Sequence, residues 1–454
     1  MQRRTFESKG ATVESKGAAV GQASWATLAG ALPRAYILVA FANFTVGVCL
    51  GFSMAVSPAL WPTLSSVHAE LNPFGWLTIL IYGMTYAVLT LFANLRPPWP
   101  VIGWVQLATA ELGVVLVAVA PLVAAHELTR IGMFFQALAP VIFTVNIVTA
   151  VYARHGGKAR GAVAATVSEA DWPVELDRRF FGRARELRAT DRIAQRGTTL
   201  ALLIYLAAVA WAFVHAQNPS ATAYSIHGKD RLLVYYGWIL GTVLSVSLHL
   251  VPRYAAGQQV VTKVQAQTGQ LLWLAGAVLI AASPWPSGIA SVGVRLMGTA
   301  IAFHAVLYGV RLRSAVRGLP RAVAVAWYGG WAFALVLGAA LLGGLDPLSL
   351  AALHMLFLGW ITSLVYGVGY TFFPFVLRKR VPSPALSVLQ VGASLLGASA
   401  MTVSLLYLDA GDGGDAIVAL LAAGGSLAAL GALYFLAQWP FSLRAAAPDN
   451  ADRG

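Results

Sequence analysis

Two stretches of this sequence nearly repeat each other: residues 75–86 read GWLTILIYGMTY and residues 359–370 read GWITSLVYGVGY. Seven of the twelve positions are identical. A third pair, Gly237-Trp238, is followed by a proline 15 residues after its glycine, the same spacing that follows Gly359. All three pairs lie in long apolar segments of the kind that form helices in membranes. The repeat therefore indicates a membrane protein built from related helical units.

The composition supports this interpretation. Of the 454 residues, 58% are hydrophobic and 11% are charged, whereas about 25% are charged in an average soluble domain. So few charges cannot cover a soluble globule of this size, and the apolar content excludes a disordered or fibrous chain. The single cysteine, Cys49, excludes a disulfide framework, a cysteine-rich zinc site and an iron–sulfur cluster.

Twelve apolar segments are long enough to cross a bilayer as helices. The Gly-Trp pairs fall in the second, sixth and tenth segments, so successive copies are four helices apart. The sequence therefore predicts an all-α polytopic membrane protein with twelve transmembrane helices in three pseudo-symmetric four-helix units. The predicted spans are 34–56, 68–93, 101–125, 130–153, 198–217, 230–252, 271–288, 292–312, 322–345, 349–377, 384–408 and 415–441.

The basic residues predict the orientation of these spans. If the N-terminus lies inside, 27 of the 31 Lys and Arg residues are on the inner side, and the outer side keeps only Arg130, Lys229, Arg231 and Arg295. Such a bias is typical of helical membrane proteins. We therefore expect a multi-pass protein of a prokaryotic cytoplasmic membrane with both termini cytoplasmic. The net charge of +13 then reflects orientation and attraction to anionic lipid, and no nucleic-acid partner is expected.

The segments outside the spans are polar. Residues 1–33 are expected to form a disordered cytoplasmic tail, residues 34–441 the membrane domain, and residues 442–454 a second cytoplasmic tail. The loop 154–196 is the one long connection, and it is expected in the cytoplasm. It fits an amphipathic helix on the membrane surface and a solvated charged loop about equally well.

Two histidines are the main candidates for a functional site. His68 opens the second span and His354 lies near the start of the tenth, seven and five residues before their Gly-Trp pairs. A histidine inside a membrane is a functional candidate, and neutral imidazole is the usual axial ligand of a b-type haem. Two facing helices could hold such a haem between them. The plain alternative for His68 is an interfacial residue that bonds to water.

Four further residues are candidates for contacts with such a haem. Tyr82 and Tyr366 belong to a face rich in aromatic residues and glycine that could admit a flat macrocycle. Arg231 and Arg295 lie at span ends on the outer side, where positive partners for the haem propionates would be needed.

Two acidic residues in the spans have open roles. Glu111 lies near the middle of the third span, where a carboxylate is costly, so it either relays protons or forms a structural hydrogen bond with a neighbouring helix. Glu70 is expected to be solvated at the outer boundary.

The segments VHAELNPFGW (67–76) and HMLFLGW (354–360), together with the twelve spans, resemble the catalytic subunit of haem-copper oxidases and nitric oxide reductases. The resemblance covers about residues 34–441. It implies that His68 and His354 hold the iron of one low-spin haem b. Where the family carries a second histidine on the tenth span this sequence has Ala352, and the seventh span has no histidine. The resemblance therefore implies a lost binuclear centre, and copper is not expected.

Three functions follow from these observations. The first is electron transfer, or redox or gas sensing, through one bis-histidine haem, with an electron donor or a small gas as partner. The second is an active terminal oxidase or nitric oxide reductase subunit with ligands that the sequence does not reveal. The third is a haem-free, transporter-like membrane protein. The number of haems in the optical spectrum distinguishes the three.

Overall fold

The computed structural model describes residues 10–91, 99–155, 189–217, 228–254, 261–315, 319–377 and 383–441, and every regular element in these ranges is a helix. Three of the elements, η2, η5 and η6, are π-helical, and η1 is a short 3₁₀ turn. The elements are α1 (Gly10–Val56), η1 (Pro58–Leu60), α2 (Trp61–Glu70), η2 (Leu71–Thr78), α3 (Ile79–Leu91), α4 (Pro100–Val119), α5 (His126–His155), α7 (Ala189–Ala216), α8 (Lys229–Leu232), η5 (Leu233–Ile239), α9 (Leu240–Tyr254), α10 (Lys263–Ala282), α11 (Gly288–Ala315), α12 (Arg321–Leu342), α13 (Leu350–His354), η6 (Met355–Ile361), α14 (Thr362–Val376), α15 (Pro384–Asp409) and α16 (Asp415–Phe441).

The helices have the length and composition of membrane spans. Eleven helices within the described ranges are long and apolar enough to cross a bilayer. In addition, α2, η2 and α3 join end to end into one continuous helix from Trp61 to Leu91, which contains most of the predicted second span. The prediction of an all-helical, multi-pass membrane protein is therefore confirmed, and each of the twelve predicted spans overlaps one of these helices.

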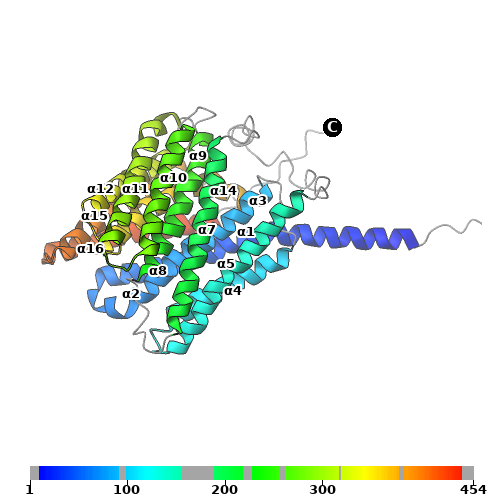
Figure 1. The fold of residues 1–454 in the computed structure, drawn as a ribbon, viewed down its shortest axis with the longest axis horizontal. Coiled ribbons are helices and arrows are strands. Elements are labelled where there is room, and N and C mark those ends of the chain that lie inside the picture. The colour runs from blue at the N-terminus through cyan, green and yellow to red at the C-terminus, as the bar shows by residue number, and fades with distance from the viewer. Residues whose placement is uncertain are drawn as a thin grey trace, which may run out of the picture.

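The start of the chain differs from the prediction. Helix α1 begins at Gly10, so residues 10–33 are helical where a disordered tail was expected. These residues include seven Ala, the residue that favours helix most, and extending an existing helix avoids the cost of nucleation. The first turns of α1 project from the bundle (Figure 1, dark blue). Residues 1–9, residues 156–188 of the predicted long loop, and the predicted tail 442–454 lie outside the described part of the chain.

Nine helices form a closed ring around the other three. Each helix of the ring packs on the next, and the last packs on the first. In order, the ring consists of α1, α4, α5, α7, α10, α11, α12, α15 and α16. Inside the ring lie the three composite helices that carry the Gly-Trp pairs. The spans Lys229–Arg253 and Leu350–Pro374 are 78% and 67% buried, against 33–50% for the other nine candidate spans, which identifies them as inner helices.

Each inner helix contains a π-helical segment, and the Gly-Trp pair has the same place in all three. The segments begin at Leu71, Leu233 and Met355, and in each one the glycine is the fifth residue and the tryptophan the sixth. A π-helix leaves backbone carbonyls without their usual α-helical partners, and π-helical turns often mark functional sites. The sequence pattern predicted the three related helices but not this local geometry.

The threonine of the repeated pattern forms a hydrogen bond with the backbone of the π-helix. Thr78 Oγ1 donates to the carbonyl oxygen of Pro73 at 2.9 Å, and Thr362 Oγ1 donates to that of Phe357 at 2.6 Å. In both cases the acceptor lies five residues earlier, within the π-helix. The threonine three residues after each glycine therefore pairs a carbonyl that the wide turn exposes.

The glycine and tryptophan of each pair pack on the ring helix that precedes them. A Cβ on Gly75, Gly237 or Gly359 would collide with a side chain of α1, α7 or α12, respectively. The three tryptophan rings pack on aromatic rings of the same three helices. The contacts are Gly75–Asn43, Gly237–Ile204 and Gly359–Phe333, and Trp76–Phe44, Trp238–Tyr205 and Trp360–Trp331.

The tyrosines that end the repeated pattern also have matching neighbours. Tyr86 packs on Phe143 of α5, and Tyr370 packs on Phe435 of α16. An amide side chain three residues after each phenylalanine donates to the tyrosine hydroxyl, from Asn146 at 3.0 Å and from Gln438 at 3.2 Å. The repeat in sequence therefore extends to contacts with helices that carry no recognisable repeat.

Glycine at position 397 allows α15 and α16 to cross closely, and its replacement with alanine is expected to destabilise the bundle. A Cβ there would lie 2.6 Å from the carbonyl oxygen of Gly424, a backbone atom that cannot rotate away. We expect a loss of about 1–3 kcal/mol in the free energy of unfolding, measured in detergent. Gly392, on the same helix, has nothing within 4 Å, so Gly392→Ala is the matched control and should be neutral or stabilising. Equal effects of the two changes would contradict the close crossing.

Candidate functional site

The structure brings His68 and His354 together. His68 lies in α2, three residues before the π-helix η2, and His354 ends α13, directly before η6. Their ring centroids are 6.4 Å apart and the ring planes differ by 14°. Residues separated by 286 positions in the chain therefore present two imidazoles to each other at the start of two inner helices.

Both imidazoles line one large cavity. The cavity is partly open to the surface. The walls come from α1, α2, η2, η5, α13, η6, α14, α15 and α16, and are mainly aromatic and aliphatic. A lining of this kind is typical of a site for an apolar ligand with few polar anchors. Representative wall residues are Phe44, Trp76, Tyr235, Phe357, Met401 and Leu405.

Backbone carbonyls orient both rings. The Nδ1 of His68 is 2.8 Å from the carbonyl oxygen of Gly47, and the Nδ1 of His354 is 2.8 Å from that of Leu350. Because a carbonyl only accepts, each Nδ1 carries the hydrogen in the neutral ring, which leaves the lone pair on Nε2. The amide of Asn72 donates to the carbonyl of His68 at 3.0 Å and lies 3.3 Å from its Nε2. Ring nitrogens held in this way are typical metal ligands.

Two glycines of α1 admit the first histidine. A Cβ on Gly51 would lie 2.7 Å from Cε1 of His68, and a Cβ on Gly47 would lie 2.6 Å from Oδ1 of Asn72. The four-residue spacing of these glycines is the pattern that lets membrane helices approach closely. This Gly-x-x-x-Gly pattern is visible in the sequence and could have predicted that α1 packs against His68.

The two predicted tyrosines are not at this site. Tyr82 packs on Tyr36 and Phe143, and Tyr366 packs on Phe435; neither lines the large cavity. The neighbouring glycine face is also filled, because a Cβ on Gly83 would collide with Tyr36. Protein side chains therefore occupy the space beside these tyrosines where a macrocycle was expected.

Arg231 and Glu70 form a buried ion pair. Their side chains are 2% and 1% exposed, and Nη2 of Arg231 is 2.6 Å from Oε2 of Glu70. The amide of Gln136 donates to the other carboxylate oxygen, and the guanidinium lies 4.7 Å from the centre of the Phe74 ring. The sequence analysis expected Glu70 to be solvated and Arg231 to face a haem propionate. The burial of Glu70 contradicts its expected solvation. Arg231 instead pairs with Glu70, 161 residues away, between α2 and α8.

Arg295 also lies away from the cavity. It is exposed on α11, a helix that contributes no residue to the cavity wall. Its position near a span end follows the prediction, but its expected role at a haem propionate does not fit this placement.

Glu111 forms a contact between helices. Its Oε2 accepts a hydrogen bond of 2.7 Å from Asn43 of α1, and the same amide donates to the carbonyl of Gly75 in η2 at 3.0 Å. Of the two roles left open by the sequence, the structural hydrogen bond to a neighbouring helix is therefore present.

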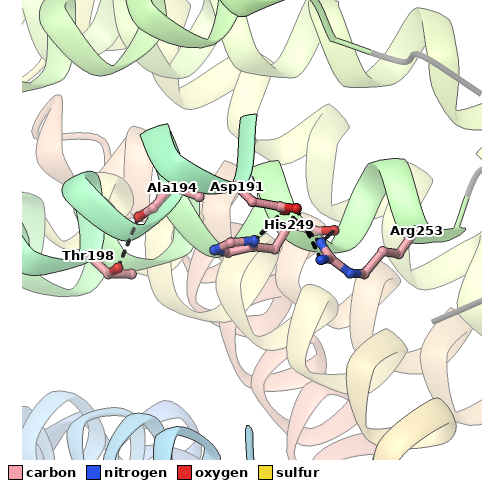
Figure 2. Close-up of polar contacts among 5 residues, drawn as sticks. All are labelled: Asp191, Ala194, Thr198, His249 and Arg253. Carbon is pink, nitrogen blue, oxygen red and sulfur yellow. Dashed lines mark hydrogen bonds and ion pairs between the residues drawn. The ribbon is translucent and has the colours of Figure 1, made fainter. Parts of the chain in front are cut away.

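A second polar cluster lies where α7 begins and α9 ends. Asp191 is 1% exposed, 2.6 Å from Nδ1 of His249 and 2.8 Å from Nη1 of Arg253 (Figure 2). It joins the two helices at their predicted cytoplasmic ends, and none of the three residues lines the large cavity. His249 is therefore placed in an ion-pair cluster apart from His68 and His354.

Large side chains fill the interior where α9, α10, α11 and α12 meet. A Cβ on Gly241 would collide with the ring of Trp273, and a Cβ on Gly269 with that of His304. The ring of Tyr308 lies between His304 and Trp331, with centroid distances of 5.8 and 4.8 Å.

The part of the chain that the structure describes contains no group of three or more His, Cys, Asp or Glu side chains that could hold a metal ion. A metal held by the two histidines of the cavity would need further ligands from outside this set of side chains, such as the nitrogens of a porphyrin. Comparison of the chain with models of protein families and with curated proteins finds no match.

Proposed function

We propose that this protein is an integral membrane b-type haem protein that transfers electrons, or senses redox state or a small gas, through one low-spin haem. The observation that carries the proposal is the pair His68 and His354, 6.4 Å apart between ring centroids in one apolar cavity. Both rings leave Nε2 as the unprotonated nitrogen, and two lone pairs in one apolar space favour a metal centre between them.

The residues present fit a haem in two respects. An iron with metal–nitrogen distances near 2 Å separates two imidazole nitrogens by about 4 Å and their ring centroids by about 6 Å, close to the 6.4 Å seen here. The flat aromatic walls suit a macrocycle. Such a haem supplies reversible one-electron transfer, and two axial histidines leave it no open position for a gas unless one histidine leaves.

The same contacts support the proposed relation to haem-copper oxidases and the three four-helix units. The three π-helices share one register, and their Gly-Trp pairs pack on the first ring helix of each unit. The ring order also repeats, because α4–α5, α10–α11 and α15–α16 are neighbouring pairs in the three units. The proposed single haem lies where the third unit meets the first.

The proposed orientation has both termini in the cytoplasm of a prokaryote, and a topology experiment tests it. Reporter domains fused after residues 220 and 410 are expected to read outside, and those fused after residues 165 and 315 inside, because of the bias in basic residues. Protease accessibility in sealed vesicles provides an independent measurement. A reversed result at either pair would overturn the orientation and place the cavity mouth on the other side of the membrane.

The optical spectrum of the detergent-purified full-length protein tests the proposed function. We expect one haem per chain with the reduced-minus-oxidised spectrum of a six-coordinate, low-spin b-type centre, and no change on adding carbon monoxide. Two haems, one of them binding carbon monoxide, would favour a terminal oxidase or nitric oxide reductase. No haem after expression in a haem-replete host would overturn the proposal in favour of a haem-free, transporter-like protein.

A further inference from the structure

We propose that the cavity recognises its haem by the ring and the iron and not by the two propionate carboxylates, which lie in solvent at the mouth beside Trp61 and Ser65 without a cationic partner. The inference rests on the proposed haem site and specifies which part of the ligand that site binds. It departs from the expectation, drawn from the sequence, that arginine side chains hold the propionates.

The basic residues on this side of the bundle are the first observation. No Lys or Arg is among the described residues that line the cavity. The charge distribution places only four on the same side as the histidines, and the stretch 218–227, which the structure does not describe, contains none. Arg130 binds Glu127 at 2.9 Å. The Nζ of Lys229 donates to the carbonyl of Ala281 at 3.0 Å.

The other two basic residues, Arg231 and Arg295, do not line the cavity either. Arg231 is held by Glu70 inside the protein, and Arg295 is exposed on α11, outside the cavity wall. Moving Arg231 to a propionate would leave the carboxylate of Glu70 buried without its ion pair, which costs several kcal/mol. None of the four is therefore available to a ligand in this cavity.

The charge near His354 is the second observation. The backbone nitrogen of Ala351, three residues before His354, is 3.5 Å from Oδ2 of Asp409 at the end of α15. A carboxylate there repels other carboxylates. The ligand's own carboxylates then have no favourable site inside the protein, because burying an unpaired charge is costly.

We assign the mouth of the cavity to the start of α2, and with it the place of the carboxylates. Among the wall residues, Trp61 and Ser65 of α2 are half-buried and Phe52 of α1 is 40% exposed. The hydroxyl of Ser65 is a neutral polar group at this opening. A haem with its propionate edge here keeps both carboxylates hydrated while the ring enters the apolar interior.

The test compares two ligands that differ only in the charge of their two propionate groups. Full-length protein from haem-deficient cells is titrated in detergent with ferric protoporphyrin IX and with its dimethyl ester, in which both carboxylates are capped. The two dissociation constants are expected to agree within about threefold, since no charge is recognised, with the same low-spin spectrum. An ester that binds more than about tenfold more weakly overturns this inference and leaves the haem proposal intact. Failure of both ligands to give a low-spin spectrum overturns the haem proposal itself.

A charge placed at the mouth tests the orientation of the ring. Ser65→Arg is expected to favour protoporphyrin IX over the ester by a few-fold, the size of an exposed ion pair. Thr63, exposed on the same helix and outside the cavity wall, gives the matched control Thr63→Arg, which should leave the ratio unchanged. An unchanged ratio in Ser65→Arg overturns the placement of the propionates, and a changed ratio supports it.

Discussion

Replacing His354 with alanine is expected to abolish the low-spin haem spectrum of the purified protein, and replacing His68 is expected to do the same. Each ring would supply one of two axial bonds, so its loss leaves a five-coordinate iron that no longer has a low-spin spectrum. The measurement is the reduced-minus-oxidised spectrum together with the haem content per chain. Imidazole added to either variant should restore part of the spectrum, because it can occupy the space left by the missing ring.

Histidines elsewhere provide the controls for this result. His304 is buried and donates from Nδ1 to the carbonyl of Ala300 at 2.8 Å, and His249 binds Asp191. Neither lines the cavity, so His304→Gln and His249→Gln should keep the spectrum in whatever protein remains folded. Full retention of the spectrum in His68→Ala, or its loss only in the control variants, would contradict the proposed ligands.

Breaking the buried pair of Glu70 and Arg231 is expected to destabilise the fold strongly. Arg231→Met leaves a carboxylate that is 1% exposed without its cation, and Glu70→Gln leaves the guanidinium without its anion. Removing one partner of a buried pair costs about 3–5 kcal/mol. We therefore expect each single variant to unfold several degrees lower in a thermal melt in detergent, with a lower yield of purified protein.

The double variant distinguishes the effect of the ion pair from the separate effects of its two residues. Glu70→Gln combined with Arg231→Met keeps an amide oxygen for Gln136 and removes both charges, so most of the stability should return. The exposed pair of Arg130 and Glu127, with side chains 44% and 72% exposed, is the control. Arg130→Met should change stability by less than about 1 kcal/mol. Losses that simply add in the double variant would show that the two residues are not coupled.

The sequence predicted the helices because membranes impose a simple rule. A span needs about 20 apolar residues whatever its neighbours are, so the positions of twelve spans follow from composition along the chain. The repeated Gly-Trp pattern likewise identified the second, sixth and tenth spans as related, and His68 and His354 as facing candidates. The contact of the two rings agrees with that expectation.

The tertiary structure decided which partner each polar side chain binds. The partner of Arg231 is Glu70, on another span 161 residues away, and no local pattern encodes that distance. The faces beside Tyr82 and Tyr366 appeared open in sequence because glycine flanks them, yet Tyr36 and Trp327 occupy the space at Gly83 and Gly367. Only packed neighbours show whether a glycine admits a ligand or another helix.

The sequence by itself determined that the chain forms apolar helices long enough to span a membrane, and it offered His68 and His354 as candidates, because both features depend on residues within single helices. The tertiary structure decided the π-helical turns, the buried ion pair and the cavity. It also decided that no Lys or Arg is among the described residues of the cavity wall. The physical reason is that an apolar residue suits lipid and protein interior equally. Its pattern therefore shows that a helix lies in the membrane, but not which face meets another helix.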